Sequence, residues 1–434
     1  MEVSVTKRMA KNFTWLSVGS IISRGLNFFA QVYVARVLGA AAFGLLNFAL
    51  AFQTYLVLVV DSGLSLLGVR EIAKAKERAG AISLNIFAIR FILALIVFLV
   101  ALLVLYFLPL SSSMRWLFIA AFSYIFYRAL NADWVFQGLE RMDQVAIANV
   151  LYSLVVFSLM VAMVRSALDL IKVPIILTLV GVGVSLVFLG LLFKRFAPTT
   201  LEHLAPTYWW DYFQEAIPLG ASVILIQIYY NLDTIMLGFM DRPEVVGWYN
   251  AAYKIFLVLV GFLGLWQSTA FPVVSRRIIE DRERTITFLN KYARLTLLVV
   301  VPLVLLITFL APWIIKLFYG VEYQSSSIAL QMLVWSTLLI VIFGIYGILV
   351  MIPLGRSKEF LYGVGSGAVV NVILNFILIP RFSFIGAAVA TILSEVMVTV
   401  VMFFLIQREI QIEILKNFRV PVVASAIASF FFFA

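Results

Sequence analysis

Long apolar stretches, separated by short polar segments, occupy most of this chain. Twelve of them lie between Phe13 and Ile406, and each is about 20 residues or longer. A helix of that length crosses a hydrocarbon layer roughly 30 Å thick at ~1.5 Å per residue. Closed barrels are the alternative in lipid, but their strands are about half as long and alternate in polarity. The pattern therefore predicts an all-α polytopic membrane protein.

The expected spans are residues 13–37, 43–66, 82–108, 115–137, 145–164, 172–193, 216–239, 247–272, 291–311, 328–352, 360–380 and 384–406. A further apolar run begins at Val420 and reaches the last residue, Ala434. Because about 15 residues are too few for a full span, we expect this run to be the start of a thirteenth helix, with the chain stopping inside it.

Composition narrows the chemistry that the chain can support. Of its 434 residues, 64% are hydrophobic and 12% are charged, whereas soluble domains average about 25% charged. Spans therefore fill the chain and leave no room for a separate soluble domain. There is no cysteine and only one histidine, His203. Thiolate metal sites, histidine clusters and histidine-based triads are thus excluded, and we expect no metal site and no cofactor.

The Lys and Arg residues lie mostly in the loops between spans. A net charge of +10 would suggest a nucleic-acid partner in a soluble protein. Here 21 of the 32 Lys and Arg residues lie at the N-terminus or in even-numbered loops, seven lie in odd-numbered loops and their flanks, and four lie within spans. Because Lys and Arg gather in cytoplasmic loops, the N-terminus is predicted to be cytoplasmic, in a cell membrane, and no nucleic-acid partner is expected.

A weak internal repeat divides the chain. Leu38-Gly39 and Phe43-Gly44 join the first two spans, and Leu237-Gly238 and Val246-Gly247 join the seventh and eighth. Six spans plus six spans predict parallel halves related by an axis along the membrane normal. The expected domains are an N-terminal six-helix lobe (1–193), a cytoplasmic linker (194–215), a C-terminal six-helix lobe (216–406), and a cytoplasmic loop with the partial thirteenth helix (407–434).

Polar side chains inside the spans mark where function should lie, because a charge at mid-bilayer costs roughly 2.5–3.5 kcal/mol even on a lenient scale. Two stripes each place an arginine near mid-span: Arg24, Asn27 and Gln31 in the first span, and Tyr124, Arg128 and Asn131 in the fourth. We interpret both as facing a water-filled cavity. The arginine fork suits phosphate oxygens.

The second half adds polar side chains for substrate contact and acidic ones for ion coupling. The expected substrate contacts there are Asn231, Tyr253 and Lys254. Three acidic residues are candidates for binding a coupling ion, Na⁺ or H⁺, or for gating: Asp233, Glu395 and, in the first half, Asp61.

Structural readings compete with these. The four basic and four acidic residues within spans are able to neutralise one another, and Asp233 is able to pair with Lys254 instead of binding an ion. For Arg90, Asp61 and Asp133, which lie nearer span ends, snorkelling to the interface is the stronger reading.

Other motifs are weaker. Gly363, Gly365 and Gly367 have the spacing of part of a dinucleotide fingerprint, but they lie in an apolar span with no preceding strand, which predicts close helix packing. No G-x-x-x-x-G-K-[ST] occurs, so the chain has no P-loop for nucleotide hydrolysis.

One longer segment carries a family resemblance. Asp133-Trp134-Val135-Phe136-Gln137-Gly138-Leu139-Glu140 resembles the "DWxFQGLE" segment of the Wzx-like polysaccharide and O-antigen repeat-unit flippases, which belong to the multidrug/oligosaccharidyl-lipid/polysaccharide exporter superfamily. Residues 35–44, 231–238 and 247–252 also look like parts of that family, and the resemblance runs over essentially the whole chain. It implies two six-helix lobes around a central cavity, alternating access and, in typical members, fourteen spans. It also implies a cationic cavity, which maps by depth onto Arg24 and Arg128.

The expected function is therefore transport. We expect a flippase that carries an anionic polyprenyl-(di)phosphate-linked oligosaccharide from the cytoplasmic to the outer leaflet, with membrane lipid around it and a polysaccharide polymerase or glycosyltransferase as partner. A multidrug or cation antiporter of the same superfamily is the first alternative. A membrane glycan ligase or polymerase is the second, although the longest outer loop, residues 312–327, is short for a catalytic site.

Overall fold

The structure is a computed structural model that describes residues 2–196 and 200–407. Its elements in the first part of the chain are α1 (Glu2–Asp61), α2 (Leu64–Lys74), η1 (Lys76–Arg78), α3 (Ala79–Phe107), α4 (Ser112–Phe122), α5 (Tyr124–Leu130), α6 (Asp133–Gly138), α7 (Met142–Met163), η2 (Ala167–Asp169), α8 (Lys172–Leu191) and η3 (Leu192–Phe196). Those in the second part are η4 (Leu201–His203), η5 (Pro206–Tyr208), α9 (Trp209–Met240), α10 (Pro243–Glu280), α11 (Arg282–Phe318), η6 (Val321–Tyr323), α12 (Ser326–Phe343), η7 (Gly344–Met351) and α13 (Ser357–Ile406).

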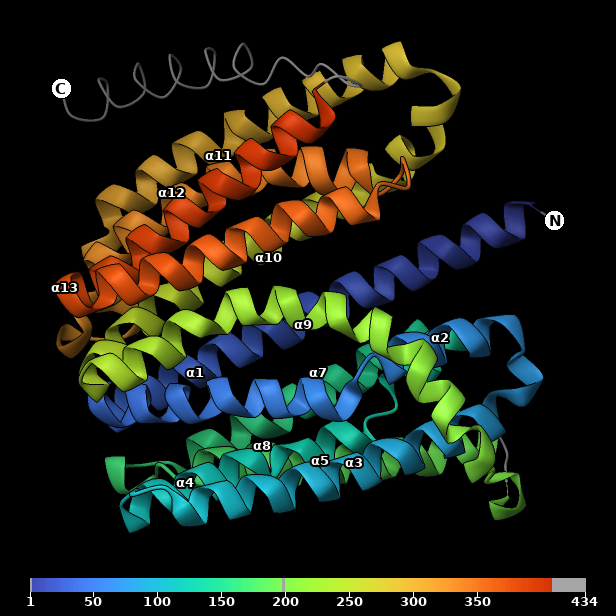
Figure 1. The fold of residues 1–434 in the computed structure, drawn as a ribbon, viewed down its shortest axis with the longest axis horizontal. Helices are drawn as coiled ribbons and strands as arrows, with labels where there is room; N and C mark the ends of the chain where they lie inside the picture. Colours follow the sequence, from blue (N-terminus) through green and yellow to red (C-terminus); the bar gives the residue numbers. More distant parts are fainter. Residues whose placement is uncertain (1, 197–199, 408–434) are drawn as a thin grey trace. The chain divides into compact units, whose positions relative to one another are not determined.

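The regular elements of the described residues are all helices (Figure 1). Eight of them are long and apolar enough to cross a membrane. The prediction of an all-α polytopic membrane protein is thus confirmed. The apolar run expected to start a thirteenth helix lies outside the described residues.

Two of the long helices each hold two expected spans, joined at a sharp kink. α1 kinks at Gly39, whose φ of 76° and ψ of 169° are readily adopted only by glycine. α13 kinks at Ser383, a non-glycine residue with φ of 56°. Its hydroxyl donates a hydrogen bond to the carboxylate of Asp241, which compensates for the unfavourable backbone conformation.

The fourth expected span, 115–137, is not one helix. It consists of α4, α5 and α6, with breaks at Ser123 and at Asn131–Ala132. Asn131 is extended (φ −64°, ψ 126°), and its side-chain oxygen accepts the backbone N–H of Asp133 at 3.1 Å. An asparagine that bonds the backbone two residues on offers the chain a turn in place of a helix. A hydropathy pattern does not show that such a side chain competes with the helix for the backbone N–H.

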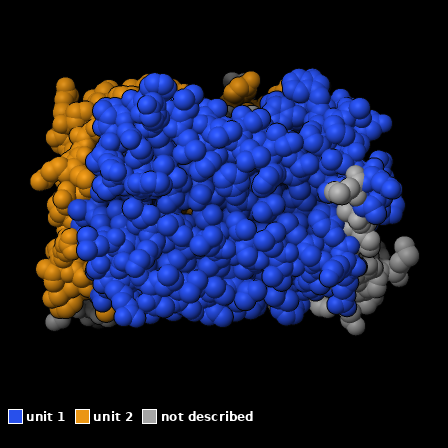
Figure 2. Space-filling model, turned by 90° about the horizontal axis from the view of Figure 1, so that it is seen from below, with its two compact units in different colours: residues 1–228 blue, residues 229–434 orange. Residues whose placement is uncertain are grey.

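The chain divides into two compact units, residues 1–228 and 229–434, coloured blue and orange in Figure 2. The boundary between them falls within α9. The finer division into lobes, linker and terminal segment therefore stays a prediction, as does the parallel repeat.

Within the first unit, the segment before α9 is fastened to α3 by one side chain. The Asn85 amide oxygen accepts the Ala205 N–H and the Trp209 indole N–H, both at 2.8 Å, and the amide nitrogen donates to the His203 carbonyl at 2.9 Å. A further contact joins α9 to the turn between α1 and α2, where a Cβ on Gly63 would lie 2.3 Å from the Ala216 carbonyl oxygen. Asn85 and Gly63 thus position the start of α9 on the first unit.

The glycines of α13 pack as expected at two of three positions. A Cβ at Gly363 would lie 2.7 Å from Met402, and one at Gly367 would lie 2.2 Å from Val398. Both partners belong to the part of α13 after the kink, so these glycines let its two arms lie close together. Gly365 faces open space.

Candidate functional site

In the first unit, the stripe that begins with Arg24 is divided between two environments. Asn27 donates to the Ser153 hydroxyl of α7 at 3.1 Å, and Asn27 and Gln31 line a cavity of about 70 Å³ between α1, α7 and α8. Arg24 itself is exposed and makes no hydrogen bond or ion pair with another described residue. It therefore presents an uncompensated positive charge from the middle of an apolar helix.

Arg128 lies against a group of tyrosines. Its guanidinium carbon is 5.9 Å from the centre of the Tyr127 ring, which is within the range of a cation–π interaction. Tyr127 stacks on Tyr152 of α7 with ring centres 5.2 Å apart, and Tyr124 meets Tyr127 edge-on at 5.0 Å. A Cβ at Gly181 would lie 2.4 Å from Tyr127, so glycine there makes room for the ring.

Arg90 does not reach the interface. It is 1% exposed, pairs with Asp61 of α1 at 3.3 Å and also donates to the backbone carbonyl of Arg128. Asp61 accepts a hydrogen bond from Ser65 at 2.5 Å. The expectation that this arginine snorkels is wrong, because it is held inside the unit by the partly exposed Asp61 of α1, while its Nε and Nη1 atoms are buried without a hydrogen bond to another described residue.

Arg90, Arg128, Asp61 and Asp133 form one electrostatic group. Asp133 is partly buried, accepts an amide N–H from Asn149 at 3.4 Å, and is near enough to Arg128 to interact with its charge. Two positive and two negative charges sum to zero. Arg128 is thus electrostatically compensated by its surroundings, whereas Arg24 is not.

In the second unit, Asp233 is at the centre of a buried polar cluster. Its carboxylate is 2% exposed and accepts from Tyr249 at 2.6 Å, Thr391 at 2.8 Å and Asn375 at 2.5 Å. These donors come from α10 and from both arms of α13. All three are neutral, and no positively charged side chain among the described residues pairs with the aspartate.

The alternative pairing of Asp233 with Lys254 is absent: no ion pair of Lys254 occurs among the described residues. Lys254 is partly exposed. Next to it, Tyr253 is buried and stacks on Tyr249 with ring centres 5.5 Å apart.

Glu395 and Asn371 lie next to this cluster. Glu395 is 6% exposed and lies one helical turn beyond Thr391 in α13, near Tyr230 of α9. Asn371, one turn before Asn375, accepts a hydrogen bond from it at 3.0 Å, while the Asn371 amide nitrogen and the Asn375 amide oxygen are buried without a partner. Within residues 2–196 and 200–407, no group of three His, Cys, Asp or Glu side chains is arranged to hold a metal ion.

Sequence reasoning left several participants out of the site. Tyr127 and Tyr152 carry the Arg128 environment, and Thr391 binds Asp233. Tyr127 lies three residues after Tyr124 and four before Asn131, so it lay within reach of the helical pattern. Tyr152 and Thr391 come from other helices, and only the packing reveals them.

Comparison with known proteins adds a family and a fold. The model of a family described as "Polysaccharide biosynthesis protein" matches residues 9–278. A curated protein of Escherichia coli (strain K12) named "Putative O-antigen transporter" is 25% identical over 386 residues, which cover 86% of this chain and 91% of that protein.

Among solved structures, the lipid II flippase MurJ in an inward closed conformation aligns with a TM-score of 0.75 at 16% identity, covering 95% of this chain and 91% of its own. An inward-facing multidrug resistance MATE family transporter of the MOP superfamily aligns with a TM-score of 0.73 at 17% identity, covering 91% of this chain and 97% of its own. At these identities the likeness concerns the fold alone. It does not distinguish a flippase from a multidrug transporter.

Proposed function

Because the chain belongs to the polysaccharide biosynthesis protein family, we propose that it is a flippase for an anionic polyprenyl-(di)phosphate-linked oligosaccharide. The lipid-linked sugar moves from the cytoplasmic to the outer leaflet by alternating access, to supply cell-surface polysaccharide. The E. coli relative and the two structural neighbours all bear the names of transporters or flippases. The orientation follows the loop charges, with the N-terminus in the cytoplasm and the protein in the cell membrane.

The observation that carries this proposal is the state of Arg24. Its side chain is exposed near the middle of the expected first span, residues 13–37, and has no partner among the described residues. An unpaired charge at that depth is costly unless it meets water or an opposite charge. A phosphate supplies that charge, and the guanidinium fork bonds it in two places.

Arg128 and the amides then have supporting roles. Arg128 contributes positive potential, weakened by Asp61 and Asp133, and holds the tyrosine face formed by Tyr124 and Tyr127. Flat aromatic faces and amide groups suit sugar rings. Asn131, Asn231, Tyr253 and Lys254 are proposed to complete the polar contacts with the oligosaccharide.

Asp233 is proposed as the ion-coupling residue, with Glu395 beside it and Asp61 as a gating residue in the first unit. A buried carboxylate with only neutral donors is expensive to keep ionised, so binding of H⁺ or Na⁺ there would be favoured. The hydroxyl and amide oxygens of Thr391 and Asn375 are hard ligands that suit Na⁺. The membrane potential acts in parallel, since it contributes about 2.3 kcal/mol per charge per 100 mV to outward movement of an anion.

The second candidate is a multidrug antiporter of the same superfamily. Buried Asp233 and Glu395 favour it, because cationic drugs require acidic side chains. Against it stands Arg24, which would repel a cation.

The test is leaflet-specific detection of lipid-linked glycan in cells depleted of this protein. A flippase predicts glycan trapped in the cytoplasmic leaflet, with normal distribution after re-expression. Unchanged distribution together with increased drug accumulation would support the antiporter instead. A polysaccharide polymerase or glycosyltransferase partner would be sought afterwards by co-purification.

A further inference from the structure

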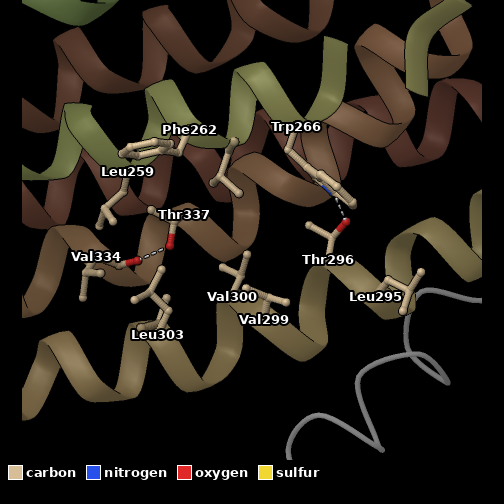
Figure 3. A pocket seen from close by; sticks show the side chains of 12 residues that line it. Leu259, Phe262, Trp266, Leu295, Thr296, Val299, Val300, Leu303, Val334 and Thr337 are labelled. Atoms are coloured by element: carbon tan, nitrogen blue, oxygen red, sulfur yellow. Dashed lines mark hydrogen bonds between the residues drawn. The ribbon is translucent and has the colours of Figure 1, made fainter. Parts of the chain in front are cut away.

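An apolar groove lies in the second unit between α10, α11 and α12 (Figure 3). Its volume is about 350 Å³, at the lower end of the range for small-molecule sites. Figure 3 shows Val299 and Leu303 of α11 facing Leu259 and Phe262 of α10 across the space. Phe262 is 59% exposed and Val299 is 66% exposed, so large apolar side chains line an open surface.

The few polar groups of this groove are already satisfied. The Trp266 indole N–H donates to the Thr296 hydroxyl at 2.9 Å, and that hydroxyl donates to the Tyr292 carbonyl at 2.8 Å. The Thr337 hydroxyl donates to the Val334 carbonyl at 2.5 Å. The wall therefore offers no free hydrogen-bond donor to an occupant, and a hydrocarbon chain is the ligand that loses least by entering it.

The end of the groove near Leu295 has polar neighbours. Leu295, Val299 and Leu303 form an i, i+4 stripe along α11, and one turn before Leu295 on that stripe is Lys291. Lys291 and Arg294 are exposed, and neither pairs with another described residue. Two cations thus lie at the N-terminal end of an apolar channel.

A second cavity of about 190 Å³ adjoins the groove and shares Leu263, Trp266 and Thr296 with it. Its lining adds an aromatic pair and an amide. Trp266 stacks on Tyr292 with ring centres 5.8 Å apart, and the Gln267 side chain makes no hydrogen bond with another described residue. Gln267 lies against Gly344, where a Cβ would approach its amide nitrogen to 2.4 Å. Gly344 begins η7, a π-helical segment of the kind that often marks functional sites.

We propose that this groove, defined by Leu259, Phe262, Leu295, Val299 and Leu303, binds the isoprenoid chain of the lipid-linked substrate as it loads, with Lys291 and Arg294 holding the phosphate before it moves to Arg24. The inference rests on the proposed flippase function. It goes beyond that function because it places the lipid tail on a specific face of the second unit, distinct from Arg24 and Asp233.

The features of the groove select this occupant over others. A glycerophospholipid brings two chains, whereas the groove is a single channel. A transmembrane helix, about 10 Å across, would lay side chains over the opening but would not fill the channel. A purely apolar cover would also leave the Gln267 amide and the two cations without partners. A single-chain amphiphile with an anionic head satisfies all three parts together.

The experiment uses the full chain in phosphatidylcholine vesicles and a polyprenyl phosphate that carries a photoreactive group in its tail. Crosslinks are located by mass spectrometry of the α10 and α11 peptides. We expect crosslinking in the groove, about tenfold lower in Val299→Trp, which fills the channel, and lower in Lys291→Gln, which removes the head-group cation. Leu298→Trp is the matched control, because it changes a neighbouring exposed side chain of the same helix that does not line the groove.

Competition with unlabelled lipids identifies which lipid supplies the hydrocarbon tail in the groove. Unlabelled polyprenyl phosphate should displace the probe, and an equal amount of phosphatidylglycerol should not. Equal displacement by both would overturn the proposal in favour of a phospholipid acyl chain. Crosslinks spread evenly over lipid-facing residues, or no crosslink in the groove, would also overturn it.

Two further measurements distinguish a folding defect from a loss of function. Leu303→Trp provides a second filled groove if Val299→Trp does not elute as a single species in detergent. Groove crosslinking in a protein that does not flip lipid-linked sugar would leave the lipid site standing and remove the flippase proposal. Normal flipping by a Val299→Trp protein with no change in crosslinking would remove the lipid site and leave the flippase proposal standing.

Discussion

Arg90 of α3 and Asp61 of α1 form an ion pair of 3.3 Å in which the arginine is 1% exposed while the aspartate side chain is 26% exposed. This asymmetry has a consequence for stability. Removing the aspartate leaves a buried guanidinium without its counter-charge, whereas removing the arginine leaves a carboxylate that water still reaches.

We therefore expect Asp61→Asn to destabilise the protein more than Arg90→Met does. The loss for Asp61→Asn should be up to about 3–5 kcal/mol, the range for breaking a buried pair. The double variant should be more stable than Asp61→Asn alone. Thermal unfolding in detergent measures all three, and equal melting temperatures for Asp61→Asn and the wild type would show that the pair has no structural role.

Asn85 is predicted to control the segment that precedes α9. Replacing it by leucine removes three hydrogen bonds to residues 203–209 and leaves the Ala205 N–H, the Trp209 indole N–H and the His203 carbonyl without this partner, at roughly 1–3 kcal/mol for each group that is buried. Trypsin should then cleave faster after Arg195. Ser83→Ala is the control, since its hydroxyl bonds only the Gly80 carbonyl of its own helix. Identical cleavage rates in Asn85→Leu and Ser83→Ala would contradict this assignment.

Asp233→Asn is expected to separate the two driving forces. The amide keeps the size of the side chain but removes the charge that would attract Na⁺ or H⁺. Flipping in vesicles driven by an ion gradient should fall to the level without a gradient, while flipping driven by a clamped potential should persist. Thr391→Val, which removes one donor to the carboxylate, should weaken the ion dependence partly. A proportional loss under both driving forces would indicate a structural aspartate.

Much of the fold was predictable because lipid imposes it. A span must be helical and long enough, so residues 79–107 or 282–318 are recognisable from apolar length alone. The kink at Gly39 was visible as a Leu-Gly link. The kink at Ser383 was not, because a serine with positive φ depends on a partner, Asp241, that lies more than a hundred residues away.

The sites were predictable only as residue types and depths. Arg24 and Asp233 stand out because charges are rare in spans. Whether each one is paired depends on which helix faces it. Arg90 pairs with Asp61. Asp233 accepts hydrogen bonds from Tyr249, Thr391 and Asn375 and does not pair with Lys254. Helical periodicity gives the face of one helix but not the neighbour that the face meets.

The central claim, that Arg24 receives the phosphate of a lipid-linked sugar, is tested most directly by flipping in proteoliposomes. A fluorescent polyprenyl-diphosphate oligosaccharide is followed by a quencher that reaches only the outer leaflet. Wild-type protein should flip it well above empty vesicles. Arg24→Ala should be slower by roughly ten- to a hundredfold, as expected for losing a charge-assisted hydrogen bond of ~1.5–3 kcal/mol, with Arg24→Lys between them and Ile22→Ala unchanged. Flipping by Arg24→Ala at the wild-type rate, or no flipping by the wild type, would contradict the account.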